Sequence, residues 1–277
     1  MCPRESRASN RATAVALGMR QLIGWRRLSR DEAIVAVALA ILAILAWIYT
    51  ILLSGSLAGL DLHNLMAMPR QGEWTSLDLA LTFLMWAVMM AAMMIPSAMP
   101  MILLFTAIER RRESTGALSR TTAFVSGYAA AWVVFSLLAT LAQWGLHDAA
   151  MLSSAMGRLV PWAASLVLAL AGLYQFSPLK RTCLHHCSSP LEFLTAHWRP
   201  GGEGALRMGL RHGGYCLGCC WAFMFVLFVV GVMNILWVML IAIAVLLEKL
   251  MPGRDRLRMA LGAALLAWSA VVATASM

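Results

Sequence analysis

Long apolar stretches, interrupted by short segments that carry arginine, repeat along the 277 residues of this chain. A helix needs about 20 apolar residues to cross the roughly 30 Å of hydrocarbon in a bilayer, and several stretches reach that length. The pattern therefore predicts an all-α fold, a polytopic transmembrane helical bundle of about seven spans. The expected spans are residues 33–53, 77–107, 121–144, 160–176, 210–230, 235–247 and 257–275.

Only four residues separate the fifth and sixth expected spans. One overlong helix would also fit their hydropathy, but Gly231 and Asn234 favour a tight turn between two helices. We therefore expect residues 33–277 to form a single transmembrane bundle, preceded by a basic tail over residues 1–32.

Lysine and arginine residues alternate between dense and sparse segments. Twenty of the 22 fall in the tail or in the connections after the second, fourth and sixth spans, and the opposite side keeps only Arg70 and Arg158. Because short cytoplasmic loops are enriched in Lys and Arg, this distribution predicts a cytoplasmic N-terminus and a multi-pass protein of the bacterial inner membrane. The first span is too long for the apolar core of a signal peptide, so we expect it to remain as an anchor.

The composition agrees with a bilayer as the main solvent. Hydrophobic residues make up 61% of the chain and charged residues 13%, against about a quarter charged in soluble domains. The formal net charge of +9 follows from the predicted topology, because these cations flank the spans and attract anionic lipid head groups. The expected partner of this charge is the lipid bilayer, and nucleic-acid binding is not expected.

Five of the six cysteines fall in the window from residue 183 to residue 220, in two groups. Cys183 and Cys187 are four residues apart and would share a face of a helical turn. The second group lies at the start of the fifth span, where a helix would align His212, Cys216, Cys220 and Met224 in one stripe, with Cys219 beside it.

Both cysteine groups are expected near the cytoplasmic side, where thiols stay reduced, so metal or redox chemistry is favoured over a structural disulfide. Thiolates, with or without imidazole, form a soft tetrahedral site that suits zinc or copper(I). Two other interpretations stay open: the cysteines pack as small apolar residues, or they carry out thiol–disulfide exchange. The candidate ligands are Cys183, Cys187, Cys216, Cys219, Cys220, His186 and His212.

The second span is rich in methionine. A helix would place Met85, Met89 and Met93 on one side, together with Met99, and the stripe of Met90, Met94 and Met101 on the other. A thioether is a soft ligand for copper(I) and a poor one for zinc, so the Met85, Met89 and Met93 stripe is a candidate copper path, although methionine also simply fills irregular cores. Pro96 and Pro100 should bend this helix.

Other features of the chain give less chemistry. Glu248 and Lys249 close the sixth span, either as an interfacial ion pair or as charge partners of a metal site. The sequence holds no phosphate-binding loop, nucleophile elbow, paired catalytic carboxylates or dinucleotide fingerprint. An enzymatic activity is therefore the less favoured interpretation.

A family resemblance covers about residues 80–250. The residues that carry it are Met85, Trp86, Met89, the run from Ala92 to Pro96, Pro100, Tyr174, Leu179, Lys180, Cys183, Cys187, Pro190, Gly209, Gly213, Cys216, Gly218, the run from Cys219 to Trp221, Met224, Gly231, Met233, Asn234, Trp237, Glu248 and Lys249. In these positions the chain resembles the predicted metal-binding integral membrane proteins, domain of unknown function family 2182. The resemblance implies a bound metal near the matching cysteines, but no known substrate or reaction.

The leading hypothesis from the sequence is a membrane protein that handles or transfers copper(I), favoured over zinc, through a cysteine cluster at the cytoplasmic face and the methionine-rich, kinked helix. A metallochaperone or a metalloenzyme is the expected protein partner. One alternative is a structural zinc site in a membrane scaffold or assembly factor. The other is a membrane thiol–disulfide oxidoreductase that uses Cys216 and Cys219.

Overall fold

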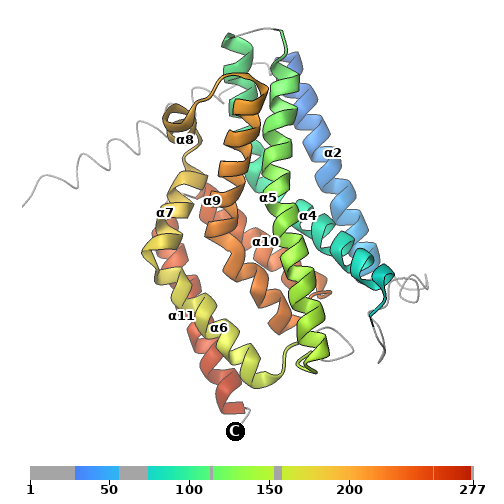
Figure 1. The fold of residues 1–277 in the computed structure, drawn as a ribbon. Helices are drawn as coiled ribbons and strands as arrows, with labels where there is room; N and C mark the ends of the chain where they lie inside the picture. The colour runs from blue at the N-terminus through green and yellow to red at the C-terminus, as the bar shows by residue number, and fades with distance from the viewer. Residues whose placement is uncertain (1–28, 56–73, 113–114, 153–157, 252, 276–277) are drawn as a thin grey trace, which may run out of the picture.

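The computed structural model describes residues 29–55, 74–112, 115–152, 158–251 and 253–275. In these ranges it is all-helical, which confirms the predicted fold class, apart from an isolated β-bridge between Leu152 and Leu159. The helices are α2 (Arg30–Leu53), α4 (Ser76–Arg112), α5 (Ala117–Asp148), α6 (Pro161–Phe176), α7 (Pro178–Ser188), α8 (Pro190–His197), α9 (Gly201–Val230), α10 (Ile235–Leu250) and α11 (Arg254–Ala275) (Figure 1).

Five helices of the described chain are long and apolar enough to cross a membrane: α2, α4, α5, α9 and α11. Helices α6 and α10 have 16 residues each, about 24 Å at 1.5 Å per residue, which is less than the hydrocarbon thickness. Helices α6 and α7 meet the criterion only as a pair bent by 66°, which would give six spans. The count of seven spans and the cytoplasmic N-terminus stay predictions, and residues 1–28 of the basic tail lie outside the described residues.

Helix α9 occupies the middle of the bundle. It packs most extensively against α5 and also contacts α7, α6 and α10, while α6 pairs with α11 and α2 pairs with α4 (Figure 1). The predicted turn between the fifth and sixth spans is confirmed: α9 ends at Val230, α10 begins at Ile235, and the Asn234 side chain accepts a hydrogen bond from the backbone of Trp237.

Helix α9 begins nine residues before the expected start of the fifth span at residue 210. The expected bounds leave residues 201–209 outside the span, whereas in the structure they form the first turns of α9. Gly209 serves helix packing, because a Cβ at this position would lie 2.8 Å from the carbonyl carbon of Phe124 on α5. Small residues let two helices approach this closely, so the stretch extends α9 and fixes it against α5.

Candidate metal centre

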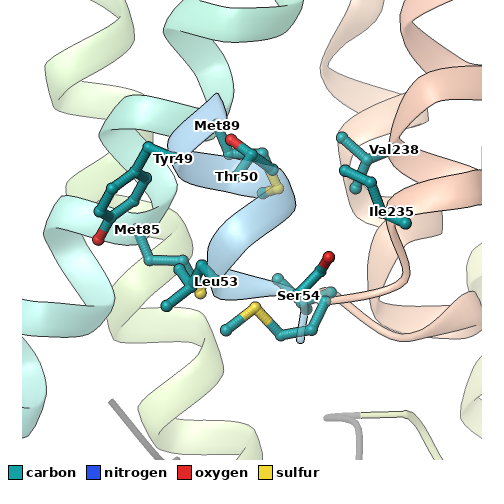
Figure 2. A pocket seen from close by; sticks show the side chains of 10 residues that line it. Tyr49, Thr50, Leu53, Ser54, Met85, Met89, Ile235 and Val238 are labelled. Carbon is teal, nitrogen blue, oxygen red and sulfur yellow. The ribbon is translucent and has the colours of Figure 1, made fainter. Parts of the chain in front are cut away.

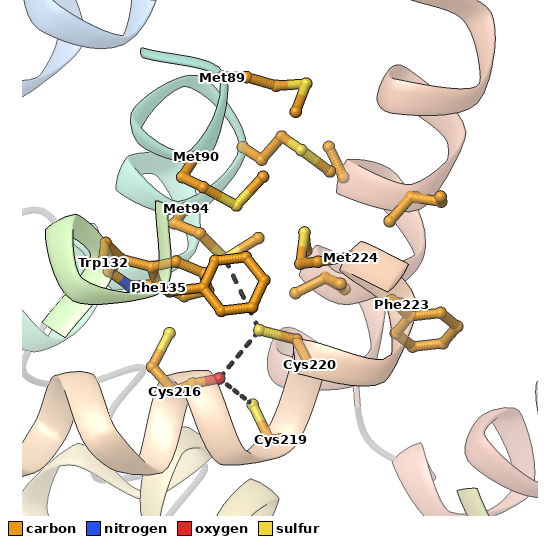
Figure 3. Close-up of a cluster of buried hydrophobic side chains, with 14 of the residues drawn as sticks. Met89, Met90, Met94, Trp132, Phe135, Cys216, Cys219, Cys220, Phe223 and Met224 are labelled. Carbon is orange, nitrogen blue, oxygen red and sulfur yellow. Dashed lines mark hydrogen bonds between the residues drawn. The ribbon is translucent and has the colours of Figure 1, made fainter. Parts of the chain in front are cut away.

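Three cysteines lie on one buried region of α9. Cys216, Cys219 and Cys220 are each at most 2% exposed. The thiols of Cys219 and Cys220 both donate to the carbonyl oxygen of Cys216, over 3.0 and 2.9 Å (Figure 3). The predicted stripe exists, since His212, Cys216, Cys220 and Met224 are all buried along α9. These thiols therefore line the interior of the bundle.

Helix α7 brings a fourth thiol to this region. The side chain of Cys187 is buried, and its thiol interacts with the thiols of Cys216 and Cys219. Gly218 of α9 allows α7 to lie this close, because a Cβ at position 218 would lie 2.8 Å from the Sγ atom of Cys183 on α7. Cys183 itself stays partly exposed at the edge. We call Cys187, Cys216, Cys219 and Cys220 the cysteine cluster.

A thioether from α4 completes the sulfur-rich environment. Met94 Sδ lies 3.9 Å from Cys220 Sγ, and Met94 is fully buried (Figure 3). Met94 belongs to the stripe that the sequence analysis did not favour. Helix α4 packs mainly against α2 and α5, and its rotation in the bundle decides which stripe meets the cysteines. The spacing of the methionines carries no signal for that choice.

The favoured stripe points elsewhere. Met85 and Met89 line a small pocket, together with Met233 from the turn between α9 and α10 and with Thr50 and Leu53 of α2 (Figure 2). We call this the methionine pocket. Met93, the third member of the stripe, is buried in the apolar core. The structure therefore separates two of the three candidate methionines from the cysteine cluster.

Two polar side chains hold Cys216. The ammonium of Lys249, at the end of α10, donates to Cys216 Sγ over 3.0 Å and to Ser97 Oγ over 2.9 Å. The hydroxyl of Tyr128 on α5 lies 3.1 Å from Cys216 Sγ. Tyr128 is not among the candidate residues predicted from the sequence, although a hydroxyl inside an apolar span is a signal, because polar groups buried in a membrane tend to be functional.

The Glu248–Lys249 pair is divided between two partners. Glu248 forms an ion pair with Lys180 of α7 over 2.8 Å, and both side chains are almost fully buried. Lys249 instead faces Cys216 and Ser97. Of the two sequence interpretations, a charge partner for the thiols describes Lys249, whereas Glu248 belongs to a structural ion pair.

The two candidate histidines differ in their surroundings. His212 is 1% exposed, lies one turn before Cys216, and packs against the rings of Tyr128 and Phe193. Its Nδ1 atom has no hydrogen-bond partner in the described structure, and in the tautomer with the proton on Nε2 the lone pair of Nδ1 is free to bind a metal. His186 lies against the ring of Tyr215, and among the described residues no hydrogen bond joins it to a cysteine.

The donor set fits a soft metal better than a preformed zinc site. In the described residues, no three His, Cys, Asp or Glu side chains are already arranged to hold a metal ion, whereas structural zinc takes four such ligands in a closed tetrahedron. Thiolates with a neighbouring thioether are soft ligands that copper(I) prefers. The residues that would hold copper(I) as cargo are Cys216 and Cys220, with Cys187, Met94 and His212 beside them.

Comparison with known proteins supports the same metal. The chain matches the family model described as PpoB2, copper chaperone, over residues 83–272, which include the whole cysteine cluster, Met94 and Lys249. No curated protein and no solved structure matches the chain. The match supports a copper-related role, and the resemblance to domain of unknown function family 2182 stays an expectation. Since the matched residues cover more than two-thirds of the sequence, the chain belongs to the PpoB2 family of copper chaperones.

Proposed function

We propose that this protein binds copper(I) as cargo at the cysteine cluster and hands it to a protein partner. The observation that carries the proposal is the burial of thiols from two helices, α7 and α9, against a thioether from a third, α4. Burial in an apolar interior excludes competing water and hard cations. Soft sulfur donors then select a soft metal.

Binding at this site is an exchange of a metal for a proton. A thiolate is the form of cysteine that binds metals. With the ammonium of Lys249 balancing Cys216 as the first thiolate, the second cysteine would release one proton as copper(I) enters. Cys216 and Cys220 are one helical turn apart on α9 and so can share one ion. Rotation of the Cys220 thiol away from the Cys216 carbonyl oxygen would bring both sulfurs to the metal.

The methionines of α4 extend the sulfur environment away from the cluster. Met94 contacts Cys220, Met93 lies in the core, and Met85 and Met89 line the methionine pocket. Thioethers bind copper(I) without adding negative charge. We propose that this series of soft donors offers copper(I) a route between the cysteine cluster and the N-terminal half of α4, where Met85 and Met89 lie.

The proposed setting is the bacterial inner membrane, with the N-terminus in the cytoplasm. Five long apolar helices are compatible with a membrane bundle, and the distribution of Lys and Arg favours this orientation. The family description fits delivery to a metalloprotein. We propose a metallochaperone or a metalloenzyme as the acceptor.

Metal binding by the full-length protein tests the proposal. Protein purified in mild detergent under reducing conditions should bind copper(I) in competition with a chelator, and it should release the ion to a stronger copper(I) acceptor. The Cys216→Ser/Cys220→Ser variant should lose this copper. Preferential binding of zinc, retained in the presence of the acceptor, would instead support a structural zinc site, and a reducible disulfide in metal-free protein would support an oxidoreductase.

A further inference from the structure

Lys249 is a buried cation with an unusual partner. Its side chain is 5% exposed, and its ammonium group contacts a thiol and a hydroxyl group, those of Cys216 and Ser97. In the described part of the chain no carboxylate lies within 4.0 Å of this ammonium. A buried charge is costly unless it is paired, so the sulfur of Cys216 is the group that can balance Lys249.

The other charges around the cluster are already paired. Glu248 precedes Lys249 on α10, but its carboxylate bonds to the ammonium of Lys180 over 2.8 Å. Arg258 of α11 bonds to the carbonyl oxygen of Gln175 and lies 3.6 Å from the carboxylate of Asp255. Lys249 is therefore the one cation of this group that contributes an unbalanced positive charge to the cysteine cluster.

We propose that Lys249 makes the cysteine cluster selective for monovalent over divalent soft metals. This inference rests on the proposed copper(I) function and concerns the charge that the site accepts. Copper(I) with two thiolates carries one negative charge, which the ammonium of Lys249 neutralises. The metal enters as one positive charge while one thiol proton leaves, so the net charge of the buried cluster is the same before and after binding.

A divalent metal does not fit the same arrangement. Zinc(II) with two thiolates is neutral, and Lys249 then remains as an uncompensated buried cation. Neutrality would require a third thiolate, so Cys187 or Cys219 would also have to release its proton, and tetrahedral zinc needs a fourth donor as well. In the described residues no three such side chains are already arranged to hold a metal ion. The ammonium also repels a divalent ion twice as strongly as a monovalent ion at the same distance.

The position of Lys249 suits this role. Ser97, which shares the ammonium with Cys216, lies on α4 one turn after Met94. The ammonium can therefore stay on Ser97 Oγ when a metal takes its place on Cys216 Sγ. The charge remains beside the metal without occupying a coordination position, because an ammonium carries no lone pair.

The experiment compares a monovalent with a divalent metal in two pairs, copper(I) with zinc(II) and silver(I) with cadmium(II). An effect of the metal's charge should appear in both pairs. Full-length wild type and Lys249→Met, purified metal-free in mild detergent, are titrated with copper(I), silver(I), zinc(II) and cadmium(II) in competition with chelators. We expect Lys249→Met to lower the preference for copper(I) over zinc(II), and for silver(I) over cadmium(II), by about tenfold or more. Lys249→Arg keeps the charge and should retain the preference within about threefold.

Two controls keep the outcome decisive. The Lys180→Met/Glu248→Leu variant removes a nearby buried lysine without changing the net charge, so it should leave both preferences unchanged. If Lys249→Met does not elute as a folded protein, Lys249→Gln replaces it. Unchanged preferences in Lys249→Met or Lys249→Gln, or a loss of the preferences in Lys249→Arg, would overturn the selectivity proposal. Copper(I) binding by the wild type would in that case still support the proposed function. Failure of the wild type to bind copper(I) would overturn both.

Discussion

The cysteine cluster and the methionine pocket both place sulfur in the interior, but their surroundings differ. Cys216 is contacted by the ammonium of Lys249 and the hydroxyl of Tyr128. The ion pair of Lys180 with Glu248 joins α7 and α10, the two helices that carry Cys187 and Lys249. Among the described residues, the methionine pocket is lined by apolar side chains and the hydroxyl-bearing residues Tyr49, Thr50 and Ser54, and none of these lining residues is formally charged.

This difference separates two kinds of copper chemistry. Thiolates are anionic, so a thiolate site needs a counter-charge when it is buried, and Lys249 supplies one. Thioethers are neutral and need none, but they hold copper(I) without charge attraction. Under the proposed function, the cluster would therefore retain copper(I), and the pocket would pass it on.

The buried ion pair should matter most for stability. Lys180→Met leaves the carboxylate of Glu248 buried without its partner, which typically costs about 3–5 kcal/mol, and thermal unfolding in detergent should show a clear loss. Lys180→Met/Glu248→Leu should recover most of that loss. Met89→Leu in the methionine pocket is the matched apolar control, with an expected cost below about 1.5 kcal/mol. Equal stability of Lys180→Met and Met89→Leu would contradict the contrast.

The two cysteines of α7 should differ in copper binding. Cys187 interacts with the α9 thiols, so Cys187→Ser should weaken copper(I) affinity by about 10–100-fold, the range for contacts just outside the ligands of a metal site. Cys183 lies at the partly exposed edge against Gly218, and Cys183→Ser should change affinity by less than about threefold. Chelator competition measures both, and an equal loss would mean that the two thiols serve one site.

Met94 should contribute less than a thiolate but more than its neighbours on α4. Met94→Leu preserves volume and removes the thioether next to Cys220, and we expect copper(I) affinity to fall by about tenfold, within the range for contacts at metal sites. Met90→Leu replaces an equally buried methionine one turn away and should have no effect. Sulfur coordination measured by X-ray absorption should lose one thioether in the first variant only.

We expect the smallest effect on copper binding from the stripe of Met85, Met89 and Met93, which the sequence favoured as a copper path. The triple variant Met85→Leu/Met89→Leu/Met93→Leu should fold and keep the copper of the cysteine cluster within about threefold, because two of these residues line the methionine pocket instead. If the pocket lies on the copper route, copper tolerance and accumulation in cells should still change. Met90→Leu/Met101→Leu is the control, and normal copper handling by both variants would make the stripe a packing feature.

Much of the architecture follows from one-dimensional patterns. Runs of apolar residues predicted an all-α bundle, and Gly231 with Asn234 predicted the break between α9 and α10. The spacing of four residues between His212, Cys216 and Cys220 also predicted their common buried face. These inferences succeed because helix periodicity and turn chemistry are local properties of the backbone.

Other features depended on which helices meet. Residues 201–209 have the composition of a loop, but in the structure they form the start of α9, and Gly209 packs against Phe124 of α5. Helices α6 and α10 have 16 residues each, close to the 17 and 13 residues expected from the sequence, whereas the 66° bend between α6 and α7 had no sequence prediction. Composition reports that a segment is apolar, whereas a bend between two such helices is set by packing.

The sequence by itself determined the soft donors of this protein: five clustered cysteines, a methionine-rich helix and the spacing that places each on a helical face. Only the tertiary structure decided which of them meet. It placed Met94 against Cys220, turned Met85 and Met89 towards a separate pocket, and set Lys249 beside Cys216. The physical reason is that periodicity fixes the face of a helix, while the rotation and approach of two helices are fixed by side chains far apart in the chain.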